Sequence, residues 1–146
     1  MSKIERIRPG AKAFIVHNGK ILIIKERLPG EAAEVIHDLP GGGIELGETI
    51  HDALHREVME EVGLTIEIVR PVGCWGFVNH LPLEDVHIVC MGYQCRLIGE
   101  PTIDVHNNPA EEDIFEAVWL TKEEILDSGI LTKHPDMALS LENVQI

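Results

Sequence analysis

The sequence is poor in features that mark several whole classes of protein. Cysteine occurs only three times in 146 residues, as Cys74, Cys90 and Cys95, and no two of them form a CxxC pair. An odd number of unpaired cysteines argues against a disulfide framework, and we expect reduced thiols in a cytoplasm. No apolar run approaches the roughly 18 residues that cross a bilayer. The N-terminal stretch MSKIERIRPG lacks the apolar segment of a signal peptide.

Positive charge is also scarce. The chain has 12 basic and 25 acidic side chains, which gives a formal net charge of −13. Nucleic-acid backbones and anionic membranes bind through basic patches, so we expect neither as a partner. Small phosphorylated substrates remain compatible with this charge, because a bound divalent cation reverses its local sign.

Apolar and strand-forming residues are abundant, at 45% hydrophobic. The length fits a single domain over residues 1–146, without internal repeats or linkers. Strands are predicted by β-branched and aromatic runs, which lie at 11–27 (a hairpin turning at Asn18-Gly19), 65–78, 86–98 and 114–120. Helices are predicted at 50–62, after the capping box of Thr121 and Glu124, and within the last residues. These elements indicate a mixed sheet with helices packed on its faces.

The helix predicted at 50–62 concentrates acidic residues where helix physics disfavours them. Glu57, Glu60 and Glu61 fall within roughly 80° of one another on a helical wheel, at the edge of the apolar side. Like charges at these spacings cost roughly 0.2–0.5 kcal/mol per pair, and acids in the last turn oppose the helix dipole. A solvated acidic face is one interpretation. A site for a hard divalent cation, which prefers oxygen ligands, is the other.

The segment before this helix favours a binding site. LPGGGIELGE contains three consecutive glycines, residues 41–43, which we expect to lie outside regular structure. Glycines let a backbone approach an ion or a phosphate closely. Because this segment directly precedes the helix, both can border one site.

Residues 42–64, GGIELGETIHDALHREVMEEVGL, resemble the Nudix box of the Nudix hydrolase family at every defining position. That pattern is Gly, five residues, Glu, seven residues, then Arg-Glu-aliphatic-any-Glu-Glu-any-Gly-aliphatic. It is met by Gly42, Glu48, Arg56, Glu57, Val58, Glu60, Glu61, Gly63 and Leu64. The resemblance implies an α/β fold, an α/β/α sandwich with a mixed β-sheet and a loop–helix–loop catalytic motif. It also implies hydrolysis of a diphosphate bond in a nucleoside diphosphate derivative, such as a nucleoside triphosphate or a nucleotide sugar.

The resemblance further implies a metal centre. Members of the family use Mg²⁺ or Mn²⁺, and transfer to matching positions makes Glu57 and Glu61 the principal ligands. Glu60 becomes a further ligand or a general base, and the carbonyl of Gly41 completes the shell. Dimers are frequent among family members, so a homodimer stays open.

Two other box residues are expected to pair with each other. Glu48 and Arg56 brace the loop against the helix in this family, and a structural role for Glu48 is at least as well supported as a catalytic one. Position 43 is glycine, whereas some nucleoside-triphosphatase members carry lysine there, so that phosphate contact does not transfer.

Residues outside the box leave alternatives open. The general base is Glu60, or Glu111 or Glu112 in a distant loop. Lys25 and Arg27, just after the first hairpin, are candidates for binding a terminal phosphate, although isolated basic residues often face solvent.

Aromatic residues and the function itself also leave alternatives. Trp75 or Phe77 either stacks a nucleobase or fills the core. A non-catalytic Nudix-fold sensor of a nucleotide or ADP-ribose is the alternative function, and an isomerase of the same fold is a third. The complete box argues against both.

Overall fold

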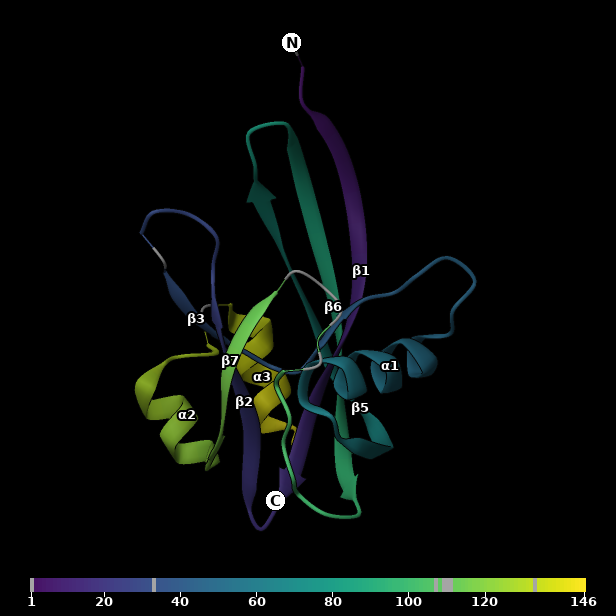
Figure 1. The fold of residues 1–146 in the computed structure, drawn as a ribbon, viewed down its shortest axis with the longest axis vertical. Helices are drawn as coiled ribbons and strands as arrows, with labels where there is room; N and C mark the ends of the chain where they lie inside the picture. The colour runs from purple at the N-terminus through teal and green to yellow at the C-terminus, as the bar shows by residue number, and fades with distance from the viewer. Residues whose placement is uncertain (1, 33, 107, 109–111, 133) are drawn as a thin grey trace.

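The computed structural model describes residues 2–32, 34–106, 108, 112–132 and 134–146, and every structural statement below concerns these residues. Seven strands and three helices lie along them (Figure 1). The strands are β1 (Ile4–His17), β2 (Lys20–Arg27), β3 (Val35–Asp38), β4 (Gly41–Gly43), β5 (Thr65–His80), β6 (Glu84–Ile98) and β7 (Asp113–Leu120). The helices are α1 (Ile50–Val62), α2 (Lys122–Ser128) and α3 (Pro135–Glu142). None of these helices combines the length and apolar character needed to span a bilayer.

The strands form one mixed sheet. Its order is β3-β2-β1-β6-β5, with β4 pairing β1 and β7 pairing β2. β1 and β6 run parallel over residues 4–16 and 84–96, whereas the other pairs are antiparallel. β1 and β2 pair only next to their turn, and beyond it β1 pairs β4 while β2 pairs β3. The two strands therefore diverge from their common turn.

The predicted hairpin turn is confirmed. Asn18 has a φ of 51° and Gly19 a φ of 75°, and positive φ at both central residues matches the twist of a tight hairpin.

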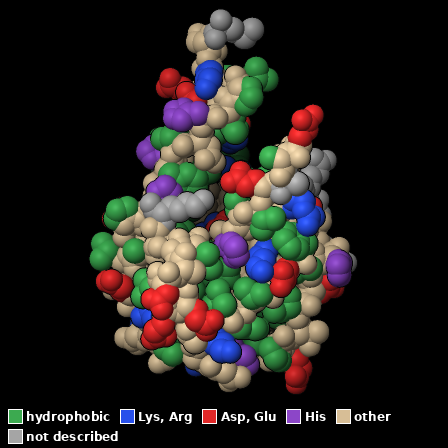
Figure 2. Space-filling model, turned by 90° about the vertical axis from the view of Figure 1, so that its left-hand side faces the viewer, with side chains coloured by type: hydrophobic (Ala, Val, Ile, Leu, Met, Phe, Trp, Pro, Cys, Tyr) green, Lys and Arg blue, Asp and Glu red, His purple; other side chains and the backbone are tan. Residues whose placement is uncertain are grey.

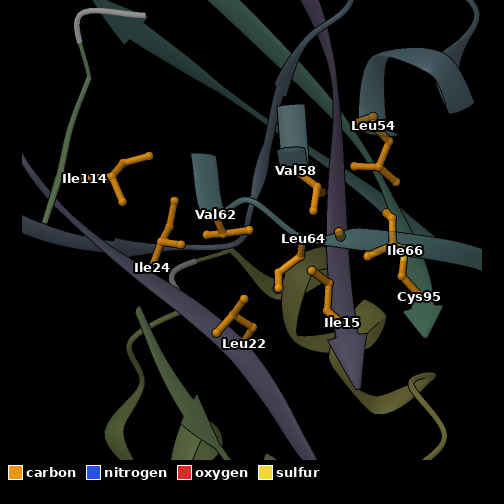
Figure 3. Close-up of a cluster of buried hydrophobic side chains, with 12 residues drawn as sticks. Ile15, Leu22, Ile24, Leu54, Val58, Val62, Leu64, Ile66, Cys95 and Ile114 are labelled. Atoms are coloured by element: carbon orange, nitrogen blue, oxygen red, sulfur yellow. The ribbon is translucent and has the colours of Figure 1, made fainter. Parts of the chain in front are cut away.

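Alternating side chains along the strands build an apolar layer on each face of the sheet. One layer lies under α1 (Figure 3), and its labelled members are Ile15, Leu22, Ile24, Leu54, Val58, Val62, Leu64, Ile66, Cys95 and Ile114. The other layer lies under α2 and α3 and includes Phe14, Ile21, Ile23, Trp75, Ile125, Met137 and Leu141. This arrangement confirms the predicted α/β/α sandwich with a mixed sheet.

The ends of α1 follow the sequence. The Thr49 side chain accepts a hydrogen bond from the Asp52 amide at 3.0 Å, which satisfies one free amide of the first turn. Gly63 ends the helix with a φ of 69°, a left-handed conformation that glycine adopts without strain. These two caps fix where the acidic last turn of α1 lies.

The prediction that Gly41–Gly43 would stay outside regular structure was wrong. These residues form β4, in which Gly43 pairs with Gly10 of β1. A Cβ atom on Gly41 would lie 2.1 Å from the Ala11 carbonyl oxygen. The absence of side chains lets β4 lie this close to β1.

Beyond the body of the molecule, β1, β5 and β6 continue as a projecting arm, visible at the top of Figure 1. We define the arm as residues 4–9, 76–80 and 84–89, which remain paired to one another. The arm carries side chains well above the rest of the sheet.

Candidate functional site

A cleft of about 550 Å³ opens where β1 and β2 diverge. Figure 2 shows the surface hollowed beside the projecting arm. Residues from β1, β2, β3, β4, α1 and the segment before β7 form what we call the charged wall, which comprises Arg8, Lys12, Glu26, Asp38, Gly41, Gly42, Gly43, Glu61 and Glu112. Residues from β5, β6, α3 and the segment before α3 form what we call the apolar wall, which comprises Trp75, Phe77, Ile88, Leu131, His134 and Met137.

Arg56 gathers three glutamates beside the charged wall. Its Nε and Nη2 atoms donate to both carboxylate oxygens of Glu48, at 2.7 and 2.9 Å. Its Nη1 donates to Glu57 at 3.0 Å and to Glu60 at 3.3 Å, and Nη2 also donates to the Gly43 carbonyl at 3.1 Å. The bonds from Arg56 lower the pKa of Glu48 to about 2. The Glu48–Arg56 pair implied by the resemblance is present.

Glu57 and Glu61 both lie against the glycine strand β4. The Gly41 amide donates to Glu61 Oε1 at 2.6 Å. A Cβ atom on Gly42 would lie 2.7 Å from the carboxyl carbon of Glu57. Glycine at these positions therefore admits both carboxylates to the backbone.

The Glu61 carboxyl group is buried, and burial disfavours its ionised form. It is 2% exposed, and burial raises its pKa to about 9, against the attraction of Lys12. Lys12 donates to Asp38 at 2.9 Å and to the carbonyls of Leu39 and Gly41 at 3.2 Å each. Burial opposes the charge of Lys12, but Asp38 and Glu61 outweigh it and raise the pKa of Lys12. No sequence pattern indicated Lys12, because a single basic residue within a strand forms no pattern.

The apolar wall presents two rings side by side. Phe77 and His134 stack with ring centroids 5.0 Å apart and an interplanar angle of 1°. Trp75 is 3% exposed and packs edge-on against Phe14, at a centroid distance of 6.0 Å. Of the two aromatics considered for base stacking, Trp75 mainly fills the core, whereas Phe77 is half-buried at the cleft.

The sequence model of the NUDIX domain family matches residues 6–143. The chain belongs to the Nudix hydrolase family. A nucleoside triphosphatase, NudI, of Enterobacter sp. (strain 638) is 31% identical to this Nudix hydrolase over 127 residues, which are 77% of this chain and 80% of that protein. An oxidized purine nucleoside triphosphate hydrolase of Mus musculus is 32% identical over 87 residues, which are 58% of this chain and 49% of that protein.

Solved structures share the fold of this Nudix hydrolase. A MutT Nudix hydrolase from Burkholderia pseudomallei has a TM-score of 0.68 at 26% identity, covering 95% of this chain and 98% of that one. A Nudix hydrolase from Nitrosomonas europaea has a TM-score of 0.72 at 20% identity, covering 93% and 86%. The expected family and fold are thus confirmed.

The donors of this Nudix site suit a divalent cation. Among the described side chains, no three His, Cys, Asp or Glu groups converge on one point, because Arg56 holds Glu57 and Glu60 while Glu61 turns to Gly41. All donors are nevertheless oxygen atoms, and a bound Mg²⁺ or Mn²⁺ would stabilise the ionised form of Glu61, which burial disfavours. The residues present therefore fit the metal that the family uses.

Two predicted phosphate-binding residues are not brought to the cleft. Lys25 pairs with Glu116 at 3.2 Å. Arg27 pairs with Asp113 at 3.1 Å and lies over the Phe115 ring at 4.6 Å. Neither Lys25 nor Arg27 lines the cleft.

The candidates for the general base are placed differently. Glu112 lines the cleft and comes within hydrogen-bonding reach of the Glu61 carboxyl group. Glu60 lies outside the cleft lining, held by Arg56. Glu111 is outside the described residues.

Proposed function

We propose that this Nudix hydrolase cleaves a phosphoanhydride bond in a nucleoside diphosphate derivative, with Mg²⁺ or Mn²⁺ held by Glu57 and Glu61. The observation that carries the proposal is the buried Glu61 carboxyl group, bound by the Gly41 amide, in a cleft that is also lined by the residues of the apolar wall. One wall suits a cation and the phosphates it attracts, and the other suits a planar base. A nucleoside triphosphate is the favoured substrate, because relatives bear names of triphosphate hydrolases.

The residues of the chain would act mainly by holding geometry. A bound divalent cation neutralises phosphate oxygens and lowers the pKa of a water. The Gly41 amide orients Glu61, and Arg56 orients Glu57 and ties the loop through Glu48. Hydrolysis of this kind depends on positioning and charge more than on covalent catalysis.

Glu112 is the general base that we propose in preference to Glu60. It faces the cleft beside Glu61, where a carboxylate can accept a proton from an attacking water. Glu60, by contrast, is engaged by Arg56. Glu112→Gln should therefore lower turnover more than Glu60→Gln, with metal affinity measured in parallel.

A substrate screen tests the function. Release of phosphate or mononucleotide is measured from nucleoside triphosphates, nucleotide sugars and dinucleoside polyphosphates, with and without Mg²⁺. Glu61→Gln should lower turnover by roughly a hundredfold or more, while its thermal unfolding stays cooperative. Glu67→Gln is the matched control, because Glu67 pairs with Arg96 on the surface.

Two results of this screen would count against the proposal. Equal turnover in Glu61→Gln and the unmodified enzyme would overturn the metal-site assignment. Tight nucleotide binding in Mg²⁺ without any turnover would favour the sensor instead.

A further inference from the structure

A cation that no sequence pattern singled out lies directly over the glycine strand. Arg8 lies in β1 and lines the cleft. A Cβ atom on Gly43 would lie 2.7 Å from both Nε and Nη2 of Arg8. The guanidinium therefore occupies the space into which a side chain at position 43 would project.

The other cations near the site are already engaged. Lys12 donates to three oxygen atoms of the protein, one each on Asp38, Leu39 and Gly41, which uses all three of its N–H groups. Arg56 is held by glutamates and by the Gly43 carbonyl. Neither has a spare donor for a ligand in this arrangement.

Arg8 is different, because its guanidinium makes no hydrogen bond or ion pair within the described part of the chain. Together with the hydrogen bonding of Arg6, the charge of Arg8 helps to lower the pKa of Glu84, but the Glu84 carboxylate is bound by Arg6 at 2.8 and 3.1 Å. The donors of Arg8 are thus left for a ligand in the cleft.

The spacing along β4 relates Arg8 to the acidic end of the charged wall. Glu61 binds the amide of Gly41, and Arg8 covers Gly43 two residues further along. A strand rises about 3.3 Å per residue, which separates the two positions by roughly 7 Å. A chain of linked phosphates can extend over such a distance, with one end near Glu61 and the other at Arg8.

We propose that Arg8 anchors the phosphate chain of the substrate, a role for which the sequence made Lys25 and Arg27 candidates. Its planar guanidinium forms paired hydrogen bonds with phosphate oxygens. This inference rests on the proposed function, because it assumes a substrate with linked phosphates in the cleft. It makes Arg8 a binding residue for phosphate and not a metal ligand.

Binding of inorganic tripolyphosphate tests the assignment without a known nucleotide. Isothermal titration in Mg²⁺ compares the unmodified enzyme with Arg8→Ala, which should raise Kd by roughly tenfold or more, as expected for lost charge-assisted hydrogen bonds. Arg8→Lys should fall between the two. Binding of Mn²⁺ alone should be the same in Arg8→Ala as in the unmodified enzyme.

Arg6 and Arg27 supply matched controls. Arg6 lies on the same strand, pairs with Glu84 and does not line the cleft, so Arg6→Ala should leave the tripolyphosphate Kd within about twofold. Arg27→Ala should do the same. If Arg27→Ala weakens tripolyphosphate binding and Arg8→Ala does not, the proposal is overturned in favour of Arg27.

Moving the positive charge from position 8 to position 43 gives a second test. The φ of Gly43 is outside the left-handed region, so a side chain fits the backbone there once Arg8 is shortened. In Arg8→Ala/Gly43→Lys the new ammonium projects into the vacated space and should recover much of the lost affinity. Failure to recover any affinity would overturn the role given to this position.

Failure of this inference can be told from failure of the proposed function. If a nucleotide is hydrolysed but Arg8→Ala changes neither its KM nor the tripolyphosphate Kd, the role of Arg8 is wrong and the hydrolase function stands. If no nucleotide is hydrolysed but Arg8→Ala loses tripolyphosphate binding, the phosphate anchor stands and the proposed reaction fails.

Discussion

The two walls of the cleft are built in opposite ways. One part of the charged wall, Gly41–Gly43 and Glu61, comes from a short continuous stretch in which β4 and α1 are joined by one loop, and Arg56 lies in the same stretch. The apolar wall draws on β5, β6 and α3, so that Phe77 meets His134 across 56 intervening residues. The β4–α1 part of the charged wall is therefore local in sequence, whereas the apolar wall exists only after the chain has folded.

We infer from this difference that the two walls have different roles in the cleft. The β4–α1 part of the charged wall holds polar atoms in place through Arg56 and the Gly41 amide. The assembled wall offers rings and aliphatic groups, which tolerate changes in shape. We expect the first wall to set the chemistry and the second to select the group attached to the phosphates.

The pH dependence of metal binding should show the largest effect. Burial raises the pKa of Glu61 to about 9, and a metal ligand must be deprotonated. Mn²⁺ affinity should therefore rise by up to about tenfold per pH unit between pH 6.5 and 8.5. Calorimetry in buffers of different ionisation enthalpy should detect a released proton. Affinity that is independent of pH in the unmodified enzyme would contradict this, and Glu61→Gln provides the reference without that proton.

The same pKa shift predicts the stability of the metal-free protein. From about pH 4.5 to about 9 the folded state retains a proton on Glu61 that the unfolded chain has released. Stability should therefore fall as pH rises through this window, and Glu61→Gln should weaken that dependence in thermal unfolding experiments.

Gly42→Ala should disrupt the charged wall with little effect on the fold. The new methyl group would displace the Glu57 carboxylate, which is the far end of its side chain. Mn²⁺ affinity should fall by roughly 10- to 100-fold, as for residues that orient metal ligands. Gly43→Ala is the control for Mn²⁺ affinity, because its methyl group meets Arg8 instead. Equal Mn²⁺ affinities in the two variants would show that Glu57 is not held for metal.

Phe77→Ala should affect only the second wall. Loss of a stacked base costs about 1–3 kcal/mol, so KM for a nucleotide should rise roughly tenfold. Tripolyphosphate, which has no base, should bind this variant normally. Phe115→Ala is the matched control, because Phe115 lies beside Arg27 outside the cleft. Equal losses of affinity for the nucleotide and for tripolyphosphate would show that the two walls do not have separate roles.

Lys25→Ala should have the smallest effect. Lys25 pairs with Glu116 and does not line the cleft, so KM should change by less than about twofold. A larger rise in KM would indicate that Lys25 contacts the substrate, which was one interpretation of the sequence.

The acidic end of α1 and the first hairpin turn were largely predictable, because their signals are local. The helical spacing of Glu57 and Glu61, the caps at Thr49 and Gly63, and the Asn18-Gly19 turn each depend on neighbouring residues. Physical rules that operate over a few positions were enough to place them.

The remaining features depend on contacts between distant segments. The glycines of β4 become a strand only because Gly10 and Ala11 of β1 lie beside them. Arg8 and Lys12 reach the cleft only because β1 diverges from β2. The periodicity of the sequence indicates neither Arg8 nor Lys12. No local sequence pattern indicates the parallel pairing of β1 with β6 either.

That parallel pairing has a consequence for how the protein is made. β6 is the longest partner of β1 and lies about 80 residues later in the chain, so β1 cannot complete its pairing until β6 has been synthesised. Contacts of such sequence separation slow folding. During synthesis we expect the hairpin and α1 to form first, while β1 keeps an open edge until the ribosome has released β6. A chain interrupted before that strand would lack the longest partner of β1 and the part of the cleft that β6 lines.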